Sequence, residues 1–374
     1  MKKIGIITHY YRNLNYGGSL QSYALCKILN QMGYDAQQIC YDMTPVDHSR
    51  KGLLRRLKRS ARIMRSKILQ HRQMENWKIR KKAFYDFQET IPHSSKVYNK
   101  DTIGEAGNLY DLFITGSDQV FNTDWYHPAF FLDFVPEGKK KIAYAASIGK
   151  YQLDDETRQI FEKSLKDFTA VSVRETDAVD MVRECTRVPV TNTLDPTMVL
   201  TAEQWDELCA EPVVKEPYVF CFLLGEGTNE RVLAREYARK KGLKLVTLPH
   251  FPCRYLPQDA QYGDIPLYDI SPAEFISLIK FAQVIFTDSF HATAFSSTYK
   301  KEYFVFERTG GRSMRSRVVS LTNLFACEEH FLCTPERMTV SYIENAKSID
   351  YQKSNRQLEL ERQKSVEFLK KVLE

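Results

Sequence analysis

The first half of the chain alternates short apolar runs with amphipathic stretches, and this alternation predicts its fold. Four apolar runs are short enough to be buried strands, and they occupy residues 3–8, 111–115, 142–147 and 170–173. Residues 19–33 instead repeat apolar positions at helical spacing and end at Gly33, a residue type that commonly closes a helix. Another helix is expected near residues 154–167. Strands that alternate with helices favour a parallel sheet, so we predict an α/β domain.

The same alternation restarts after a proline-containing stretch at residues 191–216, whose composition indicates a crossing between domains. Beyond it, strands are expected at residues 218–225, 244–248, 284–287 and 303–306. Helices are expected at residues 230–241, 272–282 and 291–299. We therefore predict two Rossmann-like domains, residues 1–200 and 201–345, followed by a helix at residues 346–374 that packs back on the first domain. A chain of 374 residues also exceeds what one hydrophobic core usually holds.

Composition narrows the class of protein. No uninterrupted apolar stretch approaches the roughly 20 residues needed to span a bilayer, and the first apolar run is too short for a secretory signal. We therefore expect a cytoplasmic protein. Its eight cysteines include no CxxC pair and mostly lie in apolar runs, which favours reduced core thiols over disulfides or zinc. No metal site is expected.

Positive charge is concentrated in one segment. Residues 50–82 carry fourteen Lys and Arg against one acid, Glu75, while apolar residues recur at helical spacing. This pattern predicts a basic amphipathic helix. The helix either packs on the domain with a solvated basic face or meets anionic phospholipid head groups. Nucleic acid is disfavoured as a partner, because neither interleaved aromatic residues nor a known nucleic-acid motif accompanies the charge.

Candidate binding residues follow the predicted strands, since open α/β sheets bind ligands at the carboxyl ends of their strands. After the first strand the loop reads NLNYGGS and lacks the G-x-G-x-x-G of dinucleotide-binding folds, which disfavours a dehydrogenase. Asn15, Tyr16 and Gly17 instead form a polar turn before a helix, suited to an oxygen-rich ligand. An ordinary βα turn explains the same residues.

Two more strand ends carry polar residues. Gly116, Ser117 and Asp118 follow the strand at 111–115, where glycine permits close approach of a ligand to the backbone. Ser117 or Asp118 could instead cap the next helix. Arg174 leaves the strand at 170–173, placed to form a fork with a carboxylate or phosphate or simply an ion pair with an acidic neighbour.

The third cluster lies in the second domain. Ser289 and His291 stand at the start of a helix directly after the strand at 284–287. A lone histidine there is either a structural residue or an acid whose charged form a bound anion would favour. The stretch FERTGGRSMRSR then gathers four arginines around a Gly-Gly turn: Arg308, Arg312, Arg315 and Arg317. They form either an anion clamp or a solvated basic loop.

Taken in order, these segments resemble the polysaccharide pyruvyl transferases. The resemblance runs through NYGGSLQSYAL, DLFITGSDQVFN, YAASIG, VSVRE, LDPT and TDSFHATAFSS. It implies a fold like the GT-B glycosyltransferases, with two Rossmann-like domains facing a cleft. It also implies phosphoenolpyruvate as donor, no cofactor, and a growing sugar chain on a lipid diphosphate carrier as acceptor. The enzyme would then act at the inner face of the membrane, which gives the basic segment a use.

The resemblance also assigns roles to residues. His291 matches the essential histidine of the family and is the expected acid. Some members carry an arginine at the position of Ser289, so we hypothesise that an arginine of the later cluster replaces it beside Arg174. Asp118 and Asp288 are candidates for steering or deprotonating acceptor hydroxyls. The first domain is expected to serve the acceptor and the second the donor.

Two alternative functions remain open at this point. A nucleotide-sugar glycosyltransferase would use the same fold, because fold does not fix function. A non-catalytic protein that binds polysaccharide within a biosynthetic assembly is the other alternative. The combination of His291, Arg174 and the arginine cluster argues against the second alternative.

Overall fold

A computed structural model describes residues 1–44, 71–209, 211–250, 259, 262–308 and 315–374. The segment at residues 50–70, which carries most of the predicted basic helix, and the candidate Arg312 lie outside the described residues. No helix within the described ranges combines the length and the apolar character that crossing a membrane requires.

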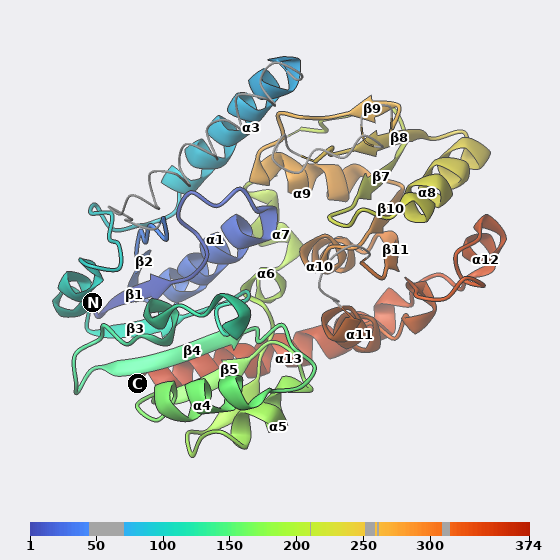
Figure 1. Cartoon of the computed structure of the whole chain (residues 1–374). Helices are drawn as coiled ribbons and strands as arrows, with labels where there is room; N and C mark the ends of the chain where they lie inside the picture. The colour runs from blue at the N-terminus through green and yellow to red at the C-terminus, as the bar shows by residue number, and fades with distance from the viewer. Residues whose placement is uncertain (45–70, 210, 251–258, 260–261, 309–314) are drawn as a thin grey trace.

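The first domain is built on one parallel sheet of six strands in the order β2-β1-β3-β4-β5-β6. Their bounds are β1 Lys3–Ile7, β2 Asp35–Gln38, β3 Leu112–Thr115, β4 Lys140–Ala146, β5 Ala170–Val173 and β6 Val190–Asn192. The predicted apolar runs thus form strands within two residues of their expected ends. Their carboxyl ends point toward the second domain (Figure 1).

The second domain contains another parallel sheet, in the order β12-β11-β10-β7-β8-β9. Its strands are β7 Tyr218–Phe222, β8 Lys244–Thr247, β9 Ile265–Pro266, β10 Val284–Thr287, β11 Glu302–Phe306 and β12 Phe331–Leu332. The two-residue strands β9 and β12 are too short to leave a sequence pattern. The α/β class with two Rossmann-like domains is confirmed.

Helices flank both sheets. Those of the first domain and the crossing are α1 Tyr16–Gln31, α3 His71–Glu89, α4 Asp155–Ser164, α5 Ala178–Arg183, α6 Pro196–Val199 and α7 Ala202–Asp206. The others are α8 Thr228–Lys241, α9 Pro272–Phe281, α10 Phe290–Thr298, α11 Arg315–Leu324, α12 Val340–Asn345 and α13 Tyr351–Leu373. The expected helix stop at Gly33 is confirmed, since this residue has φ +88° directly after α1.

The two domains share one hydrophobic core, which fixes their relation. Leu20 and Leu25 of α1 belong to the same buried cluster as Phe275 and Phe295 of the second domain. The Tyr16 ring stacks on Phe275 with 4.4 Å between centroids. Burial of aromatic and aliphatic surface on this scale makes a rigid junction, so residues from both domains can form one site.

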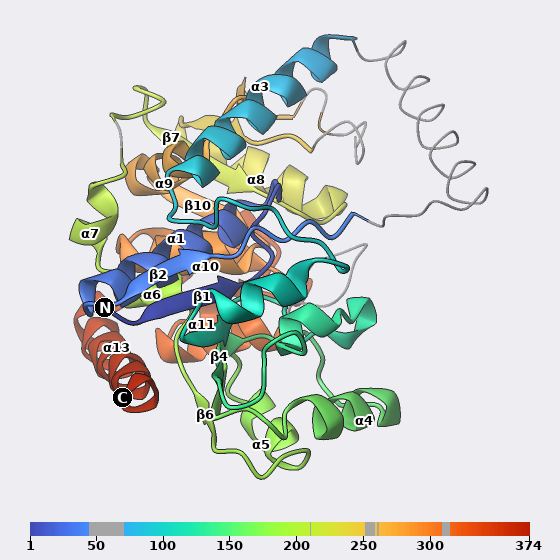
Figure 2. The ribbon, with the colours of Figure 1, turned by 90° about the vertical axis from the view of Figure 1, so that its left-hand side faces the viewer.

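The last helix α13 returns to the first domain, as predicted. Its Leu373 carbonyl accepts a hydrogen bond from Lys2 Nζ at 3.1 Å, and Figure 2 shows α13 ending near the N-terminus. The Arg362 guanidinium donates to the Met198 carbonyl at 2.8 Å, and Ser365 Oγ accepts from the Leu194 backbone N–H at 2.9 Å. These contacts attach the tail of the chain to the crossing and the first sheet.

Helix α3 connects the domains on the opposite side of the molecule. Its buried Arg80 donates hydrogen bonds to the Tyr268 and Leu267 carbonyls of the second domain, at 2.6 and 3.0 Å. Figure 1 shows α3 reaching past α9. The described end of the basic segment, residues 71–82, therefore belongs to a helix that packs on the protein through one face. Lys78, Lys82 and Ile79 are exposed on that helix.

Candidate active site

The β10–α10 junction places a histidine between the domains. All four residues of β10 are buried, and the strand stops at Thr287 because Ser289 begins α10 by accepting a hydrogen bond from the Ala292 N–H at 3.4 Å. His291 lies in the first turn of α10 and is 7% exposed. The neighbouring Asp288 holds a loop instead. Its carboxylate accepts from the Leu224 and Gly225 N–H groups at 2.7 and 2.6 Å and secures the loop after β7.

The His291 ring lies directly on the first turn of α1. A Cβ atom at Gly17 would stand only 1.9 Å from His291 Nδ1, so a side chain larger than hydrogen would displace the ring. Asn15 accepts a hydrogen bond from Gly18 N as the N-cap of α1. Tyr16 is buried against the second domain. Of the predicted N-terminal loop residues, Gly17 is therefore the one that touches His291, while Asn15 and Tyr16 hold the helix start and the domain junction.

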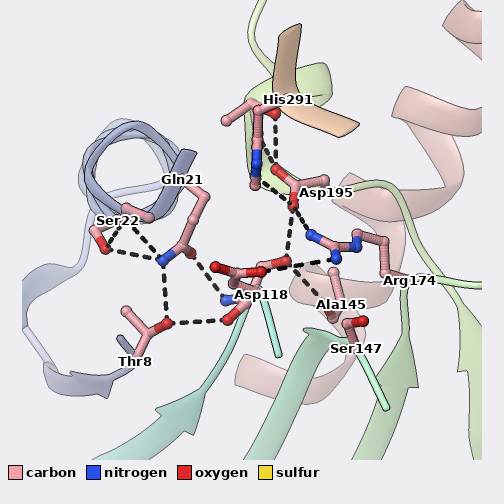
Figure 3. A network of polar contacts seen from close by, with 12 residues as sticks. Thr8, Gln21, Ser22, Asp118, Ala145, Ser147, Arg174, Asp195 and His291 are labelled. Carbon is pink, nitrogen blue, oxygen red and sulfur yellow. Dashed lines mark hydrogen bonds and ion pairs between the residues drawn. The ribbon is translucent and has the colours of Figure 1, made fainter. Parts of the chain in front are cut away.

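A buried carboxylate joins the two domains at this point. Asp195 Oδ2 accepts hydrogen bonds from Ser117 Oγ and Arg174 Nη1, each at 2.9 Å, and lies 3.6 Å from His291 Nε2 (Figure 3). The last distance is an ion-pair contact rather than a hydrogen bond of normal length. Asp195 Oδ1 accepts from the backbone and hydroxyl of Thr197, at 3.0 and 2.7 Å. Asp195 is 1% exposed, so every one of these contacts is shielded from water.

Arg174 lies in the middle of three carboxylates. Besides Asp195, its guanidinium contacts Glu175 Oε1 at 3.3 Å and Asp118 Oδ1 at 3.8 Å. Burial acts to lower the pKa of Arg174, but the charges of Glu175, Asp195 and Asp118 raise it above the ordinary value. Burial likewise acts to raise the pKa values of Asp118 and Asp195. Arg174 and His291 outweigh burial at both carboxyls and lower their pKa values.

Arg317 adds a buried cation without a direct hydrogen-bond or ion-pair partner among the described residues. It comes from α11, is 5% exposed, and makes no hydrogen bond or ion pair with any residue that the structure describes. Burial first and the neighbouring charge of Arg174 second lower the pKa of Arg317 to about 10, although the carboxylates of Glu175 and Asp118 act in the opposite direction. An unpaired buried charge is costly, by several kcal/mol per ion. A bound anion would compensate it.

Unpaired polar atoms gather around the same point. Arg174 Nη2, His291 Nε2, Arg308 Nε and Glu175 Oε2 are buried and lack a hydrogen-bond partner. Arg308 Nη2 donates to the Asp288 carbonyl at 3.0 Å, and its Nε lies 3.5 Å from the Asp288 carboxylate. Native proteins seldom leave several buried donors unsatisfied in one place. This concentration indicates a ligand that accepts hydrogen bonds.

Not every predicted cation joins this group. Arg315 begins α11 with a half-exposed side chain and pairs with Glu307 at 3.2 Å on the surface. The structure therefore brings together Arg174, Arg308 and Arg317 with His291, and leaves Arg315 outside.

The Gly-Ser-Asp segment after β3 is built into the backbone of the site. A Cβ atom at Gly116 would stand 2.2 Å from the Tyr144 carbonyl oxygen, and φ is +117° there, so only glycine fits. Ser117 is fully buried, with its N–H donating to Gln21 Oε1 at 3.0 Å. Neither Ser117 nor Asp118 caps a helix, because the next turn is capped by Asn122. Both side chains face the Arg174 cluster.

The family of the chain follows from a comparison of its sequence. A family model described as polysaccharide pyruvyl transferase matches residues 15–309, which span all the site residues up to Arg308. The chain belongs to the polysaccharide pyruvyl transferase family. The predicted resemblance is confirmed. No curated protein matches the sequence with significance.

Solved structures place this pyruvyl transferase family member among GT-B folds. It is similar to UDP-GlcNAc 2-epimerase from Methanocaldococcus jannaschii in complex with UDP-GlcNAc and UDP, with 13% identity, a TM-score of 0.55, and coverage of 96% of this chain and 99% of the other. Another structure of UDP-GlcNAc 2-epimerase from the same organism gives 11% identity and a TM-score of 0.53, again over 96% and 99%. At this identity the likeness shows the fold alone.

Sequence reasoning missed the residue at the centre of the site. Asp195 stands in the LDPT stretch, which contributes to the family resemblance but also carries the signature of a domain crossing. Asp195 follows β6 by three residues, so it marks one more strand end where a polar side chain meets the others. In the sequence, Glu175 stands out only as the acidic neighbour with which Arg174 could form an ion pair. It also accepts a 2.6 Å hydrogen bond from Ser147 Oγ, which fixes its carboxylate beside the guanidinium.

A second imidazole was also missed. His9 follows β1, contacts Gln119 O at 3.4 Å and stacks near Phe130, with 4.4 Å between ring centroids. Burial lowers the pKa of His9, although the nearby charge of Asp118 acts in the opposite direction. It therefore presents a neutral ring behind Asp118 at neutral pH. A single histidine after the first strand carries no pattern that would single it out.

Proposed function

We propose that the protein is a pyruvyltransferase that uses phosphoenolpyruvate to form a pyruvyl ketal on a sugar of a lipid-linked surface-polysaccharide precursor. One observation carries the proposal. Arg317 is a buried guanidinium that makes no hydrogen bond or ion pair with a described residue, and it belongs to one cluster with Arg174, Arg308 and a His291 nitrogen that lacks a hydrogen bond. A small ligand with two anionic groups and a carbon to be protonated fits this combination.

The chemistry sets three requirements. Two hydroxyls of one sugar form C–O bonds to C2 of phosphoenolpyruvate, and the C2–O bond to phosphate breaks. The methylene carbon gains one hydroxyl proton and becomes a methyl group, while the second proton leaves with phosphate. The site must therefore bind a carboxylate and a phosphate, protonate carbon, and hold a sugar within reach.

The residues divide among these requirements. Planar guanidinium groups match both carboxylate and phosphate, so Arg174, Arg308 and Arg317 are assigned to the donor. Because Ser289 caps α10 and cannot supply charge, Arg308 and Arg317 are the arginines that replace the one absent there. His291 is assigned the role of acid toward the methylene carbon. The donor cations come from both domains, while assignment of the first domain to the acceptor remains part of this proposal.

Asp195 supports His291 and Arg174 without contacting the donor. Its carboxylate lies 3.6 Å from His291 Nε2, where it helps to orient the ring, and the same carboxylate fixes the Arg174 fork. Asp118, whose pKa is lowered by Arg174 after opposing burial, stays ionised at neutral pH and could accept a proton from an acceptor hydroxyl. The proposal requires neither a metal nor a cofactor.

The rival function is a nucleotide-sugar glycosyltransferase. One observation favours it: the similar UDP-GlcNAc 2-epimerase structure is a complex with UDP-GlcNAc and UDP. The donor separates the two functions. The protein is incubated with phosphoenolpyruvate, or with UDP-sugars, and with lipid-linked galactose, glucose and mannosamine acceptors.

Inorganic phosphate and the mass of the sugar product are followed in the same incubations. We expect phosphate release that depends on both phosphoenolpyruvate and acceptor, with the pyruvyl group found on the sugar. Release of UDP without consumption of phosphoenolpyruvate would establish the rival. If neither reaction occurs but the protein binds saccharide, the result would favour a non-catalytic member of a polysaccharide-assembly complex.

Contact with the membrane is a separate proposal. It rests on the fourteen basic residues of segment 50–82 and on the chemistry of a lipid-linked acceptor. Flotation with vesicles that contain phosphatidylglycerol, at low and high salt, tests it. Binding at low salt that is lost at high salt is expected, and absence of binding at low salt would remove the proposal.

A further inference from the structure

Arg174, Asp195, His291, Arg308 and Arg317 together are called the reaction cluster. An interdomain cavity of about 950 Å³ adjoins it. Its walls come from the ends of β5 and β6 in the first domain, from α11 in the second, and from α13, which crosses behind them (Figure 1). Arg174, Asp195 and Phe290 form the wall toward the cluster. The volume lies at the upper end of the range of about 300–1,000 Å³ that is typical of ligand pockets.

The wall between the cavity and the cluster is thin. The Arg174 guanidinium lies 4.2 Å from the centroid of the Phe290 ring, and the Phe290 ring meets the His291 ring edge-on with 5.1 Å between centroids. A molecule in the cavity would therefore be separated from the donor site by single side chains. This geometry suits a second substrate that lies in the cavity and reacts with a donor bound on the other side of Arg174.

Helix α11 serves both compartments. Ser316, Ser320 and Asn323 recur at helical spacing and line the cavity. Arg317, one residue after the first of these, belongs to the donor cluster. The same helix can thus position a donor and a second substrate relative to each other.

The side chains of the cavity favour a neutral polyhydroxyl ligand. Asn323 and Gln357 offer amides, Ser316 and Ser320 offer hydroxyls, and several carboxylates accept hydrogen bonds from hydroxyl donors. Four lining carboxylates, Asp177, Asp180, Asp195 and Glu361, face two lining cations, Arg174 and Lys364. With four carboxylates against two cations, this lining carries net negative charge, which disfavours a nucleotide.

A second cavity provides a contrast. It has about 960 Å³, lies within the second domain between α8 and α12, and touches the cluster only through Arg308. Its lining comes from one domain and mixes apolar side chains such as Leu233 and Met338 with charged ones such as Glu236. It resembles the interdomain cavity in size but not in its access to Arg174 and Asp195.

We infer that the interdomain cavity is the acceptor site and binds the saccharide portion of the acceptor. The inference rests on the proposed function for the role of that saccharide, whereas binding of a sugar can be measured without it. The predicted acceptor residues Asn15 and Tyr16 are engaged in the helix start and the domain junction, so they leave this role to the cavity.

Saturation-transfer NMR on the full chain tests the inference directly. The probes are methyl galactoside, methyl glucoside and N-acetylmannosamine, each with and without phosphoenolpyruvate. In Ser320→Trp an indole fills the cavity, and in Asn323→Ala one amide is lost. Val232→Trp, at a 46% exposed residue of the other cavity, is the matched control.

At least one probe should bind the wild type and Val232→Trp, and the same probe should fail to bind Ser320→Trp. Asn323→Ala should weaken its binding by about tenfold, the equivalent of one lost hydrogen bond. Phosphoenolpyruvate affinity should change less than about twofold in all three variants, which also shows that each is folded.

The outcomes separate this inference from the proposed function. Equal saccharide binding by wild type and both cavity variants, or no binding of any probe to the wild type, overturns the acceptor assignment. Loss of saccharide binding in Ser320→Trp without any consumption of phosphoenolpyruvate by the wild type leaves the cavity assignment in place and defeats the proposed reaction.

Discussion

The second domain contains another buried Arg–Asp–His group, and its contrast with the reaction cluster shows what marks a site. Arg231 pairs with Asp259 at 2.9 Å and donates to the Gly225 and Gly227 carbonyls. Asp259 also contacts His250 Nδ1 at 2.6 Å, while His250 Nε2 lies 3.2 Å from the Leu224 carbonyl. None of these three side chains is among the described buried groups that lack a hydrogen-bond partner.

The reaction cluster has the same residue types but a different balance. Arg174 and Asp195 pair at 2.9 Å, yet Arg174 Nη2 and His291 Nε2 lack hydrogen bonds, and Arg317 makes no hydrogen bond or ion pair with a described residue. The Arg231 group is a closed structural buttress for the loop after β7, the loop that Asp288 also secures. Burial alone is therefore no sign of function, whereas buried donors left without acceptors indicate a missing anion.

The largest expected difference between the two groups concerns the histidines. His291→Ala should lower turnover by about 10²–10⁴-fold, the usual contribution of a general acid, and leave the free energy of unfolding nearly unchanged. His250→Ala should instead lower stability and leave turnover per folded molecule intact. Steady-state phosphate release and urea unfolding of both variants test this. Wild-type turnover by His291→Ala would refute its role as the acid.

Replacing Arg231 and replacing Arg317 should affect the free energy of unfolding differently. Arg231→Met removes the guanidinium partner of the buried Asp259 and should cost about 3–5 kcal/mol of unfolding free energy. Arg317→Met removes an unpaired buried charge, so the ligand-free protein should be at least as stable as wild type. Phosphoenolpyruvate affinity should nevertheless fall by about 2–5 kcal/mol in Arg317→Met, because a desolvated charge pair is lost.

Arg315→Met is the control for Arg317→Met on the same helix, since its side chain is half exposed and pairs at the surface. It should change phosphoenolpyruvate affinity little, because surface ion pairs contribute about 0–1 kcal/mol. Isothermal titration with phosphoenolpyruvate measures the affinities, and urea unfolding measures the stabilities. A marked loss of stability in Arg317→Met would show that this cation is satisfied and belongs with the buttress rather than the site.

Close packing against the reaction histidine can be tested separately from its chemistry. A methyl group at Gly17 would overlap the His291 ring, whereas at Gly18 the nearest atom to an added Cβ is the His9 carbonyl oxygen at 3.1 Å. Gly17→Ala should therefore lower turnover by about 10²-fold through misplacement of the ring, with phosphoenolpyruvate affinity retained. Gly18→Ala should affect turnover much less. Equal turnover losses would mean that helix α1, not the ring position, is responsible.

The sequence predicted most strands, the two domains and the returning helix, because apolar runs report burial directly. It also predicted His291, Arg174 and Arg317 as candidates, since polar residues after buried strands and arginines near glycine turns are visible in a single chain. It could not separate Arg317 from Arg315. Two residues apart on one helix, they differ only in which neighbour covers them, and that depends on the packing of both domains.

Asp195 illustrates the other limit of sequence reasoning. An Asp-Pro pair in a proline-containing stretch looks like a turn, and its partners Ser117, Arg174 and His291 are 78, 21 and 96 positions away in the sequence. Local pattern carries no information about such contacts. Asp288 shows the converse, because its place beside the histidine suggested a site residue, yet its carboxylate holds a loop.

The smallest expected effect is on stability at acid pH, where the carboxylates of Asp195 and Asp259 can be compared. The pKa values of Asp195 and Asp259 are both lowered, since His291 and Arg174 in one group, and His250 and Arg231 in the other, outweigh burial. A lowered carboxyl pKa gives stability that is present above the unfolded value of about 3.9 and lost as pH falls through the folded value. Between pH 7 and pH 3, Asp195→Asn and Asp259→Asn should each lose about 1 kcal/mol less stability than wild type, because an unfolded pKa of about 3.9 limits the loss over this range.

Phosphoenolpyruvate distinguishes the two positions, because the proposed donor site lies beside only one of them. Urea unfolding between pH 7 and pH 3 is compared with and without the donor. Saturating donor should stabilise Asp259→Asn as much as wild type at neutral pH. It should stabilise Asp195→Asn less, because Arg174 loses the carboxylate that fixes its fork. Equal stabilisation of both variants by the donor would place Asp195 with the structural buttress and detach it from the reaction cluster.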